Sequence, residues 1–346
     1  MISTAASSAR RGAAVGAGDA LPETRLDRIP LMLVPVLAIA VLPFISLPTW
    51  VTLTVAGLAM GMMIFMMASG LTLVFGLMDV MNFAHAAFIS VGAYVATSVL
   101  LRFTGWMQED NLLLNIAAVA PAVLAAMIVA GLLGWFFERV IIRPVYGQHL
   151  KQILITIGGL IVAEQLIIVI WGPDIIPLQK PATMRGSFQF GDIAVEKYRL
   201  FAVALGLLVF AGMFLVLNRT RIGLLIRAGV EDAEMVESLG YRIRRLFVGV
   251  FVAGAGLAGL GGAMWAIYQE SVSVAIGGQM IVLIFIVIII GGMGSVGGCF
   301  VGSILVGLLA NYVGYLSPKI ALGSNILLMV MILLWRPQGL YPVAKR

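Results

Sequence analysis

Long apolar runs, separated by short polar or glycine-rich breaks, occupy most of this sequence. Apolar runs of about 20 residues are typical of helices that cross a lipid bilayer. Several runs are shorter, so we expect some of the helices to be broken. The pattern predicts an all-α membrane protein with about ten transmembrane helices, or eight if two runs are re-entrant. The runs cover residues 30–48, 51–75, 81–101, 112–137, 151–171, 199–217, 246–268, 279–292, 299–316 and 320–335.

The composition supports this prediction and excludes several classes of protein. Hydrophobic residues make up 61% of the chain and charged residues 11%, whereas soluble proteins carry about 25% charged residues. Cys299 is the single cysteine and is interpreted as a buried, inert thiol, which leaves no internal disulfide and no cysteine metal cluster. The chain has two histidines, His85 and His149, so we expect no histidine-based metal site and no cofactor. The net charge of +6 comes without a basic, aromatic-rich patch, so no nucleic acid is expected.

The distribution of positive charge predicts the orientation. With the N-terminus inside and ten crossings, four segments lie in the cytoplasm: the N-terminal tail, 138–151, 218–245 and the C-terminus. They hold 16 of the 22 Lys and Arg residues, as expected for cytoplasmic segments. We therefore expect both termini inside, a disordered cytoplasmic tail over residues 1–28, and one transmembrane domain over residues 29–346. No GxxxxGK[ST] motif occurs, so any ATP hydrolysis must come from another subunit.

Polar residues inside the apolar runs are the first candidates for function. Asp79, Asn82 and His85 follow one another at a spacing of three, which would place them on one face of a helical turn. They either cap a broken helix or line a translocation path, because ionisable residues in membrane spans are costly and mark function. Glu164 lies in the middle of the fifth run, where it either bonds to a neighbouring helix or faces an aqueous cavity.

The segment 219–245 carries a second candidate function. Its helical pattern has an apolar side that includes Met235 and Leu239, and an acidic side that includes Glu231, Asp232 and Glu234. An acidic helix suits an anionic membrane surface poorly, so docking into a groove of a cytoplasmic partner is favoured over an interfacial helix. We expect Gly240 to terminate this helix, as glycine commonly does.

Two similar glycine-containing stretches suggest internal symmetry without establishing it. Residues 76–80 and 292–296 each lie between an apolar helix and a helix of small residues. Broken helices at equivalent places often line a transport site. These two stretches do not occupy equivalent positions in two five-helix halves of the predicted topology, so the likeness carries no further inference.

Several stretches, in order along residues 50–340, resemble the LivH-type permeases, the membrane subunits of branched-chain amino-acid ABC importers. Ala86 departs from that pattern, since the family often has glycine after the histidine. The matching stretches are Gly70–His85, Val91–Tyr94, Ile226–Ala228, Glu231–Ala233, Leu239–Gly240, Gly291–Gly298 and Arg336–Leu340.

The resemblance implies a non-enzymatic transport subunit in the bacterial inner membrane. It implies a second permease subunit, identical or paralogous, two cytoplasmic ATP-binding subunits and a periplasmic substrate-binding protein. Residues 221–240 would contain the helix that couples the permease to the ATPases. The residues then assigned to coupling are Arg227, Glu231, Asp232, Glu234 and Gly240.

The solute and the energy source remain open on the sequence. Members of this family import branched-chain amino acids, urea, short amides or aromatic acids. An ion-coupled secondary transporter with Glu164 and His85 as relay groups is an alternative, as is a channel or scaffold without energy coupling. The coupling-like segment favours the importer, and the scarcity of acids within the spans disfavours the secondary transporter.

Overall fold

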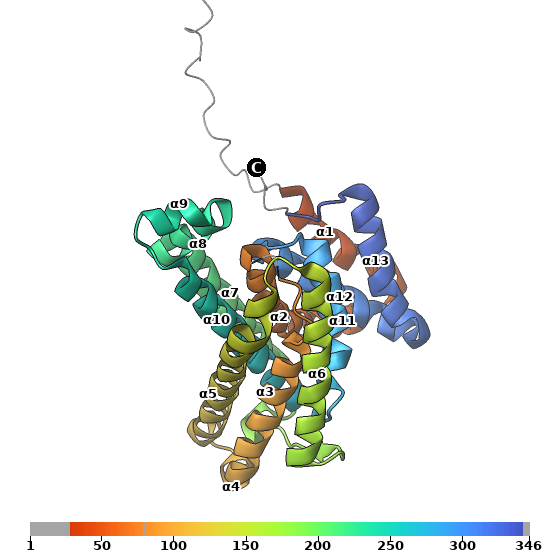
Figure 1. The fold of residues 1–346 in the computed structure, drawn as a ribbon. Helices are drawn as coiled ribbons and strands as arrows, with labels where there is room; N and C mark the ends of the chain where they lie inside the picture. Colours follow the sequence, from red (N-terminus) through yellow and green to blue (C-terminus); the bar gives the residue numbers. More distant parts are fainter. Residues whose placement is uncertain (1–27, 79, 342–346) are drawn as a thin grey trace, which may run out of the picture.

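The computed structural model describes residues 28–78 and 80–341, and helices make up most of them (Figure 1). Each of the ten predicted runs contains one main helix. The main helices are α1 (Arg28–Ala40), α2 (Leu47–Met78), α3 (His85–Leu100), α5 (Leu112–Phe137), α6 (His149–Trp171), α7 (Lys197–Arg219), α10 (Ile243–Gln269), α11 (Ile276–Gly291), α12 (Val296–Leu316) and α13 (Ala321–Trp335).

Short elements connect the main helices. Three are short α-helices and four are strands, which form two small antiparallel pairs, β1 with β4 and β2 with β3. The short helices are α4 (Thr104–Gln108), α8 (Arg221–Glu231) and α9 (Ala233–Ser238), with single turns at Leu42–Phe44, Leu101–Phe103, Glu138–Ile142, Arg143–Val145, Ala182–Met184 and Pro318–Ile320. The strands are β1 (Ile176–Pro177), β2 (Ser187–Phe190), β3 (Ile193–Glu196) and β4 (Ser271–Val272).

The helices confirm an all-α membrane protein. Seven helical segments of the described residues are long and apolar enough to cross a bilayer, and α1, α11 and α13 are shorter apolar helices. In the spanning window of α2, 78% of the residues are buried, against 22% in α6 and 11% in α7. The last two helices therefore lie on the outside of the bundle, where an apolar surface meets lipid or another subunit.

Glycines allow the central helices to approach closely. A Cβ atom added at Gly70 of α2 would overlap the carbonyl group of Gly254 in α10, and one added at Gly61 would overlap the backbone of α12 at Ser303. Small residues permit such close contacts between membrane helices. The glycines thus fix α2 at the centre, between α10 and α12.

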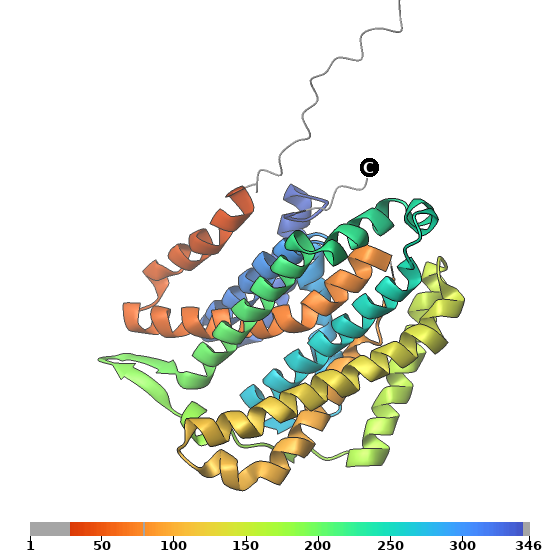
Figure 2. The same ribbon diagram turned by 90° about the vertical axis from the view of Figure 1, so that its left-hand side faces the viewer.

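The main helices follow the same packing order twice. α3 packs on α5 as α11 packs on α12; α5 packs on α10 as α12 packs on α2; and α6 packs on α3 as α13 packs on α11. Figure 2 shows α2 and α10 running side by side in opposite directions. The chain therefore consists of two five-helix units in inverted order, an arrangement found in many transporters.

Each unit contains one break between its second and third main helices. The first break (residues 80–84) joins α2 to α3, and the second break (residues 270–275) joins α10 to α11. These breaks are equivalent by position, whereas the two stretches that look alike in the sequence are not. Gly76 and Gly294 from those stretches instead lie against one another.

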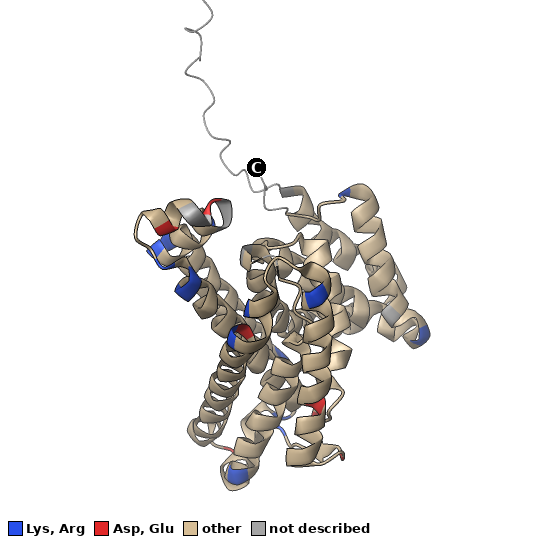
Figure 3. Cartoon of the chain, in the orientation of Figure 1, with Lys and Arg blue, Asp and Glu red and all other residues tan. Residues whose placement is uncertain are grey.

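Charged residues gather at the two ends of the bundle and leave its sides almost uncharged (Figure 3). One end carries α8 and α9, and the β2–β3 hairpin lies at the opposite end (Figure 2). Uncharged sides and charged ends suit a protein that crosses a bilayer.

Candidate transport site and coupling segment

The first break differs from the helical turn that the sequence pattern predicted. Residues 80–84 are not helical, and α3 begins only at His85. The residue before it, Ala84, occupies the N-cap position and makes no capping bond through its side chain. The prediction that Asn82 and His85 share one helical face is therefore wrong, because Asn82 precedes the helix. Asp79 lies outside the described residues.

His85 ties the start of α3 to the middle of α2. Its side chain is buried, and Nε2 lies 2.9 Å from the carbonyl oxygen of Met67. A carbonyl oxygen only accepts, so Nε2 carries the proton in this contact. The ring also meets Phe88 edge-on, with 5.9 Å between the ring centres. These contacts give His85 a positioning role at the break.

Asn82 is the unusual side chain of the first break. It is 0% exposed, and neither its Oδ1 nor its Nδ2 atom has a hydrogen-bond partner among the described residues. A buried polar group without a partner costs about 1–3 kcal/mol, and most such groups in proteins are bonded to protein or water. The amide is thus available to a water molecule or to a polar ligand.

The neighbouring contacts hold the first break between α6 and α11. The amide N–H of Phe83 donates to Thr156 Oγ1 of α6 over 3.2 Å. The ring of Phe83 lies 4.9 Å from the ring of Phe285 in α11, measured between centres. The unpaired amide of Asn82 is therefore next to two helices from different five-helix units.

The two helices that follow the breaks begin beside one another. The amide N–H of Gly277, in the first turn of α11, donates to Ser90 Oγ in α3 over 3.0 Å. A Cβ atom at Gly277 would overlap the carbonyl oxygen of Ala86, so only glycine permits this approach. Both breaks consequently meet inside the bundle, where discontinuous helices of inverted-repeat transporters form their sites.

Glu164 lies farther along α6 than the contact with the first break. It follows Thr156 by eight residues, which corresponds to about 12 Å along a helix. Its side chain is half-buried and makes no hydrogen bond or ion pair with any described residue. Its carboxylate faces the first turn of α11, where a Cβ atom at Gly278 would lie 3.8 Å from Oε1. The structure thus separates Glu164 from Asn82 and shows no bond to a neighbouring helix.

Two short helices, α8 and α9, form the segment that the sequence assigned to a partner. Asp232 lies between them and caps α9, since its Oδ1 accepts the amide N–H of Met235 over 2.9 Å. Gly240 follows α9 with a φ of +86°, a left-handed conformation that favours glycine. The prediction that Gly240 ends this helix is confirmed.

The remaining residues predicted for coupling divide into two groups. Nη1 of Arg227 donates to Asn218 Oδ1 over 3.2 Å, which joins α8 to the end of α7. The side chains of Glu231 and Glu234 lie outside the described part of the chain. The assignment of these residues to coupling stays a prediction.

The apolar side of this segment is only partly buried. Val236 of α9 and Ile226 of α8 are buried, whereas Met235 is 60% and Leu239 is 66% exposed. Exposed apolar side chains on a helix are typical anchors for a groove in a partner protein. The geometry therefore supports docking more directly than the acidic residues do.

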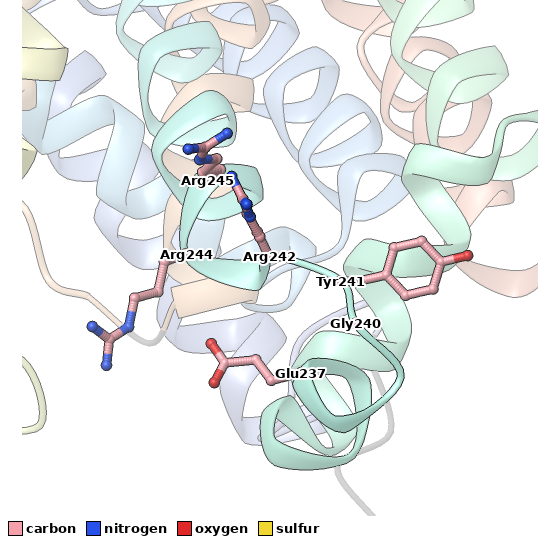
Figure 4. A pocket seen from close by; sticks show the side chains of 6 residues that line it. All are labelled: Glu237, Gly240, Tyr241, Arg242, Arg244 and Arg245. Carbon is pink, nitrogen blue, oxygen red and sulfur yellow. The ribbon is translucent and has the colours of Figure 1, made fainter.

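A basic cavity of about 450 Å³ lies between α9 and the start of α10 (Figure 4). None of its three arginines makes an ion pair with a described residue, although Glu237 is nearby. Positive charge at this level suits the cytoplasmic end of a membrane span. The lining residues are Glu237, Gly240, Tyr241, Arg242, Arg244 and Arg245.

Known proteins resemble this chain over most of its length. Residues 53–335 match the family described as branched-chain amino acid transport system, permease component. The high-affinity branched-chain amino acid transport system permease protein BraD of Pseudomonas aeruginosa is 28% identical over 83% of this chain and 94% of its own length. LivH of Escherichia coli K12, a permease protein of the same description, is 25% identical over 82% of this chain and 92% of its own length.

A second permease protein of the Escherichia coli system, LivM, is also similar to this chain. It is 27% identical over 80% of this chain and 67% of its own length. No solved structure matches this chain.

Proposed function

This chain belongs to the family of branched-chain amino acid transport system permease components, and on that premise we propose that it is the membrane-spanning subunit of an ABC importer. It moves branched-chain amino acids, or a similar small polar solute, across the bacterial inner membrane. ATP is hydrolysed by partner subunits and not by this chain. The observation that carries the proposal is the family match, which spans both breaks and the whole α8–α9 segment.

The proposed assembly contains two permease chains, two ATP-binding subunits and a periplasmic binding protein. Support for two permease chains comes from Escherichia coli, where LivH and LivM are named as permease proteins of one transport system and both resemble this chain. Support for a cytoplasmic partner comes from Met235 and Leu239, which leave an apolar surface exposed on α9.

The proposed topology has ten crossings with both termini in the cytoplasm. It rests on the excess of Lys and Arg in segments at the α8–α9 end, including the three arginines of the basic cavity. Cysteines introduced at Gln148 and Ser238 should be shielded from a membrane-impermeant thiol reagent in intact cells. Labelling of either residue from outside the cell would contradict this orientation.

The proposed path for the solute runs past the first break. Asn82 would offer its unpaired amide to the solute, with His85 holding the break in place and Asp79 and Glu164 contributing polar groups along the route. Support comes from the buried, unpartnered state of Asn82 and from the meeting of both breaks between α3 and α11.

Replacement of the exposed apolar anchors tests the coupling role of α9. The double variant Met235→Gln/Leu239→Gln should insert and fold normally, because both side chains are exposed. It should lose the co-purifying ATPase and the coupling of ATP hydrolysis to uptake in liposomes. The matched control is Phe190→Gln, which removes a side chain that is 68% exposed in the hairpin at the opposite end. Wild-type association in the double variant would remove α9 from the coupling contact.

The acidic residues are tested separately, because Asp232 also caps α9. Glu231→Lys/Asp232→Lys should weaken the ATPase contact, since like charges juxtaposed at an interface cost several kcal/mol. Asp232→Asn retains a capping side chain and should retain most of the binding. Uptake into liposomes that contain this chain but no ATPase would show that the importer proposal itself is wrong.

A further inference from the structure

Three polar side chains form an unexpected patch on the outside of the bundle. Gln165 of α6 and Gln279 of α11 are exposed, and Glu164 beside them is half-buried. None of these side chains makes a hydrogen bond or ion pair with any described residue. Glu164 joins the two helices into one surface, because its carboxylate faces Gly278, the residue before Gln279. We call Glu164, Gln165 and Gln279 the polar patch.

The polar patch lies within the membrane-spanning part of the bundle. Trp171, at the end of α6, donates from Nε1 to Ser98 Oγ of α3 over 2.7 Å, which places these two residues at one level. Glu164 and Gln165 are seven and six residues before Trp171, or about 10 Å deeper along the helix. Since the hydrocarbon core is about 30 Å thick, this depth lies inside it.

Contact with lipid is energetically unfavourable for the polar patch. A carboxyl group in the interior of a membrane span costs about 2.5–3.5 kcal/mol on insertion scales, and such groups face protein or a water-filled cavity.

The rest of the exposed face of α6 is apolar, with Val162 59% and Val169 81% exposed. Gly158 lies on the same face, and a Cβ atom there would meet nothing within 4 Å. An apolar face with a small residue and a glutamine is typical of a contact between membrane helices.

On the basis of the proposed function, we infer that the polar patch lines a water-filled stretch of the proposed solute path, at which this chain faces a second permease chain. The second permease covers the apolar part of the α6 face, and Glu164 receives the ammonium group of an amino-acid solute. The partner is assigned from the Escherichia coli system, whose two permease proteins both resemble this chain. The glutamines provide amide groups for the solute carboxylate, so that one zwitterion meets complementary groups on this surface.

Thiol accessibility tests whether water reaches the patch. Gln165→Cys and Gln279→Cys are introduced into the complete importer in liposomes, with Cys299 as a buried background. Leu208→Cys, at a position 68% exposed in the middle of α7, is the lipid-facing control. Both patch cysteines should react with a small water-soluble thiol reagent at least about tenfold faster than the control, because a thiol ionises only where water solvates the thiolate. Equal, slow labelling at all three positions would overturn the inference.

Substitution of Glu164 tests the contact with the solute. Glu164→Gln should lower leucine uptake by about tenfold to a hundredfold, the loss expected for a hydrogen bond to a charged group, while Glu164→Asp retains much of the activity. ATPase co-purification should be unchanged in both variants. Normal leucine uptake by Glu164→Gln would remove the carboxylate from the path.

Photo-crosslinking tests the identity of the partner. A benzophenone side chain at Val169 should crosslink to a permease chain, identified by mass spectrometry, and one at Leu208 should not. Crosslinking of Val169 to the ATPase or the binding protein, or to nothing, would contradict the assignment. If uptake requires ATP but the patch cysteines do not react, this inference is wrong and the importer proposal stands.

Discussion

The two breaks occupy equivalent positions in the inverted units, yet their surroundings differ. The second break is bonded along its first half: Leu178 donates its amide N–H to the carbonyl oxygen of Glu270 over 2.8 Å, and β4 pairs with β1. In the first break, the amide N–H of Phe83 donates to Thr156 Oγ1 of α6, while the side-chain amide of Asn82 has no partner among the described residues. The same architecture thus holds one break in place and leaves the other with unused hydrogen-bonding capacity.

Ion pairs explain much of the order at the second break. Nζ of Lys180, a residue that is 9% exposed, lies 2.6 Å from Glu196 and 3.1 Å from Glu270. It also lies 5.7 Å from the ring centre of Tyr198 and 5.6 Å from that of Tyr268. Burial lowers the pKa of Lys180, but the hydrogen bonds to both glutamates outweigh it, and the net pKa is raised. Lys180 therefore fixes the loop before α7 to the end of α10.

Among the variants that test the difference between the two breaks, the largest loss of stability should come from a change at Gly277, where the two breaks meet. Gly277→Val would drive a side chain into the carbonyl oxygen of Ala86 and separate α3 from α11. We expect a loss of about 3 kcal/mol or more, at the upper end for overpacked sites, and little folded protein after detergent extraction. Gly212→Val in α7 is the matched control, because nothing lies within 4 Å of a Cβ atom there. Size-exclusion profiles and thermal unfolding compare the stability of the two variants. Equal stability would show that α3 and α11 are not in tight contact at Gly277.

A smaller effect is expected when the second break loses its ion pairs. Lys180→Met should lower the unfolding free energy by about 1–3 kcal/mol, below the usual cost of breaking a fully buried pair because Glu270 is partly solvated. The exposed Lys319→Met is the control and should change little. Thermal unfolding of purified protein measures both variants.

The pH dependence of the Lys180 contribution has a definite sign. The folded pKa of Lys180 lies above its ordinary value of 10.5. The stabilisation is therefore complete below pH 10.5 and is lost as the pH rises through the folded pKa. The gap in melting temperature between wild type and Lys180→Met should stay constant from neutral pH to about 9 and narrow above the ordinary pKa. A gap that already narrows between neutral pH and about 9 would contradict the ion-pair account.

Much of the fold was predictable because the bilayer leaves few alternatives. An apolar run must become a helix in lipid, so each predicted run contains a main helix. Gly240 was predictable as a helix end because left-handed backbone favours glycine. Helical periodicity at Asn82 and His85 was misleading, because residues 80–84 are not helical and Phe83 contacts α6 and α11 there.

The site was predictable only in part, because its chemistry depends on long-range contacts. The sequence drew attention to Asn82 and Glu164. It gave no sign that Asn82 is buried without partners among the described residues, or that Glu164 is half-buried and faces the first turn of α11. The second break was missed because its order comes from Lys180, about 90 residues away in the chain. Gln279 carried a usable signal, a polar residue at the start of an apolar run, that becomes meaningful only beside Glu164.

The smallest change in stability is expected at the first break, where a substitution should nevertheless reduce uptake strongly. Asn82→Leu removes an amide that has no partner, so no hydrogen bond is lost. Replacing a buried polar group by an apolar one of similar shape is nearly neutral when no partner is left behind. We expect a change in unfolding free energy within about 1 kcal/mol, together with a marked loss of uptake if the solute uses this amide. Thermal unfolding and leucine uptake in liposomes are measured on the same preparation.

A second buried asparagine provides the control for this variant. Nδ2 of Asn115 donates to the carbonyl oxygens of Trp106 and Glu109 over 2.8 and 2.9 Å, and its Oδ1 accepts two bonds from Thr183. Asn115→Leu leaves these groups unsatisfied and should cost several times more stability than Asn82→Leu. If both variants are destabilised equally, water or protein already satisfies Asn82, and the two breaks do not differ as described. If Asn82→Leu is stable and transports normally, the difference between the breaks is real but the solute path lies elsewhere.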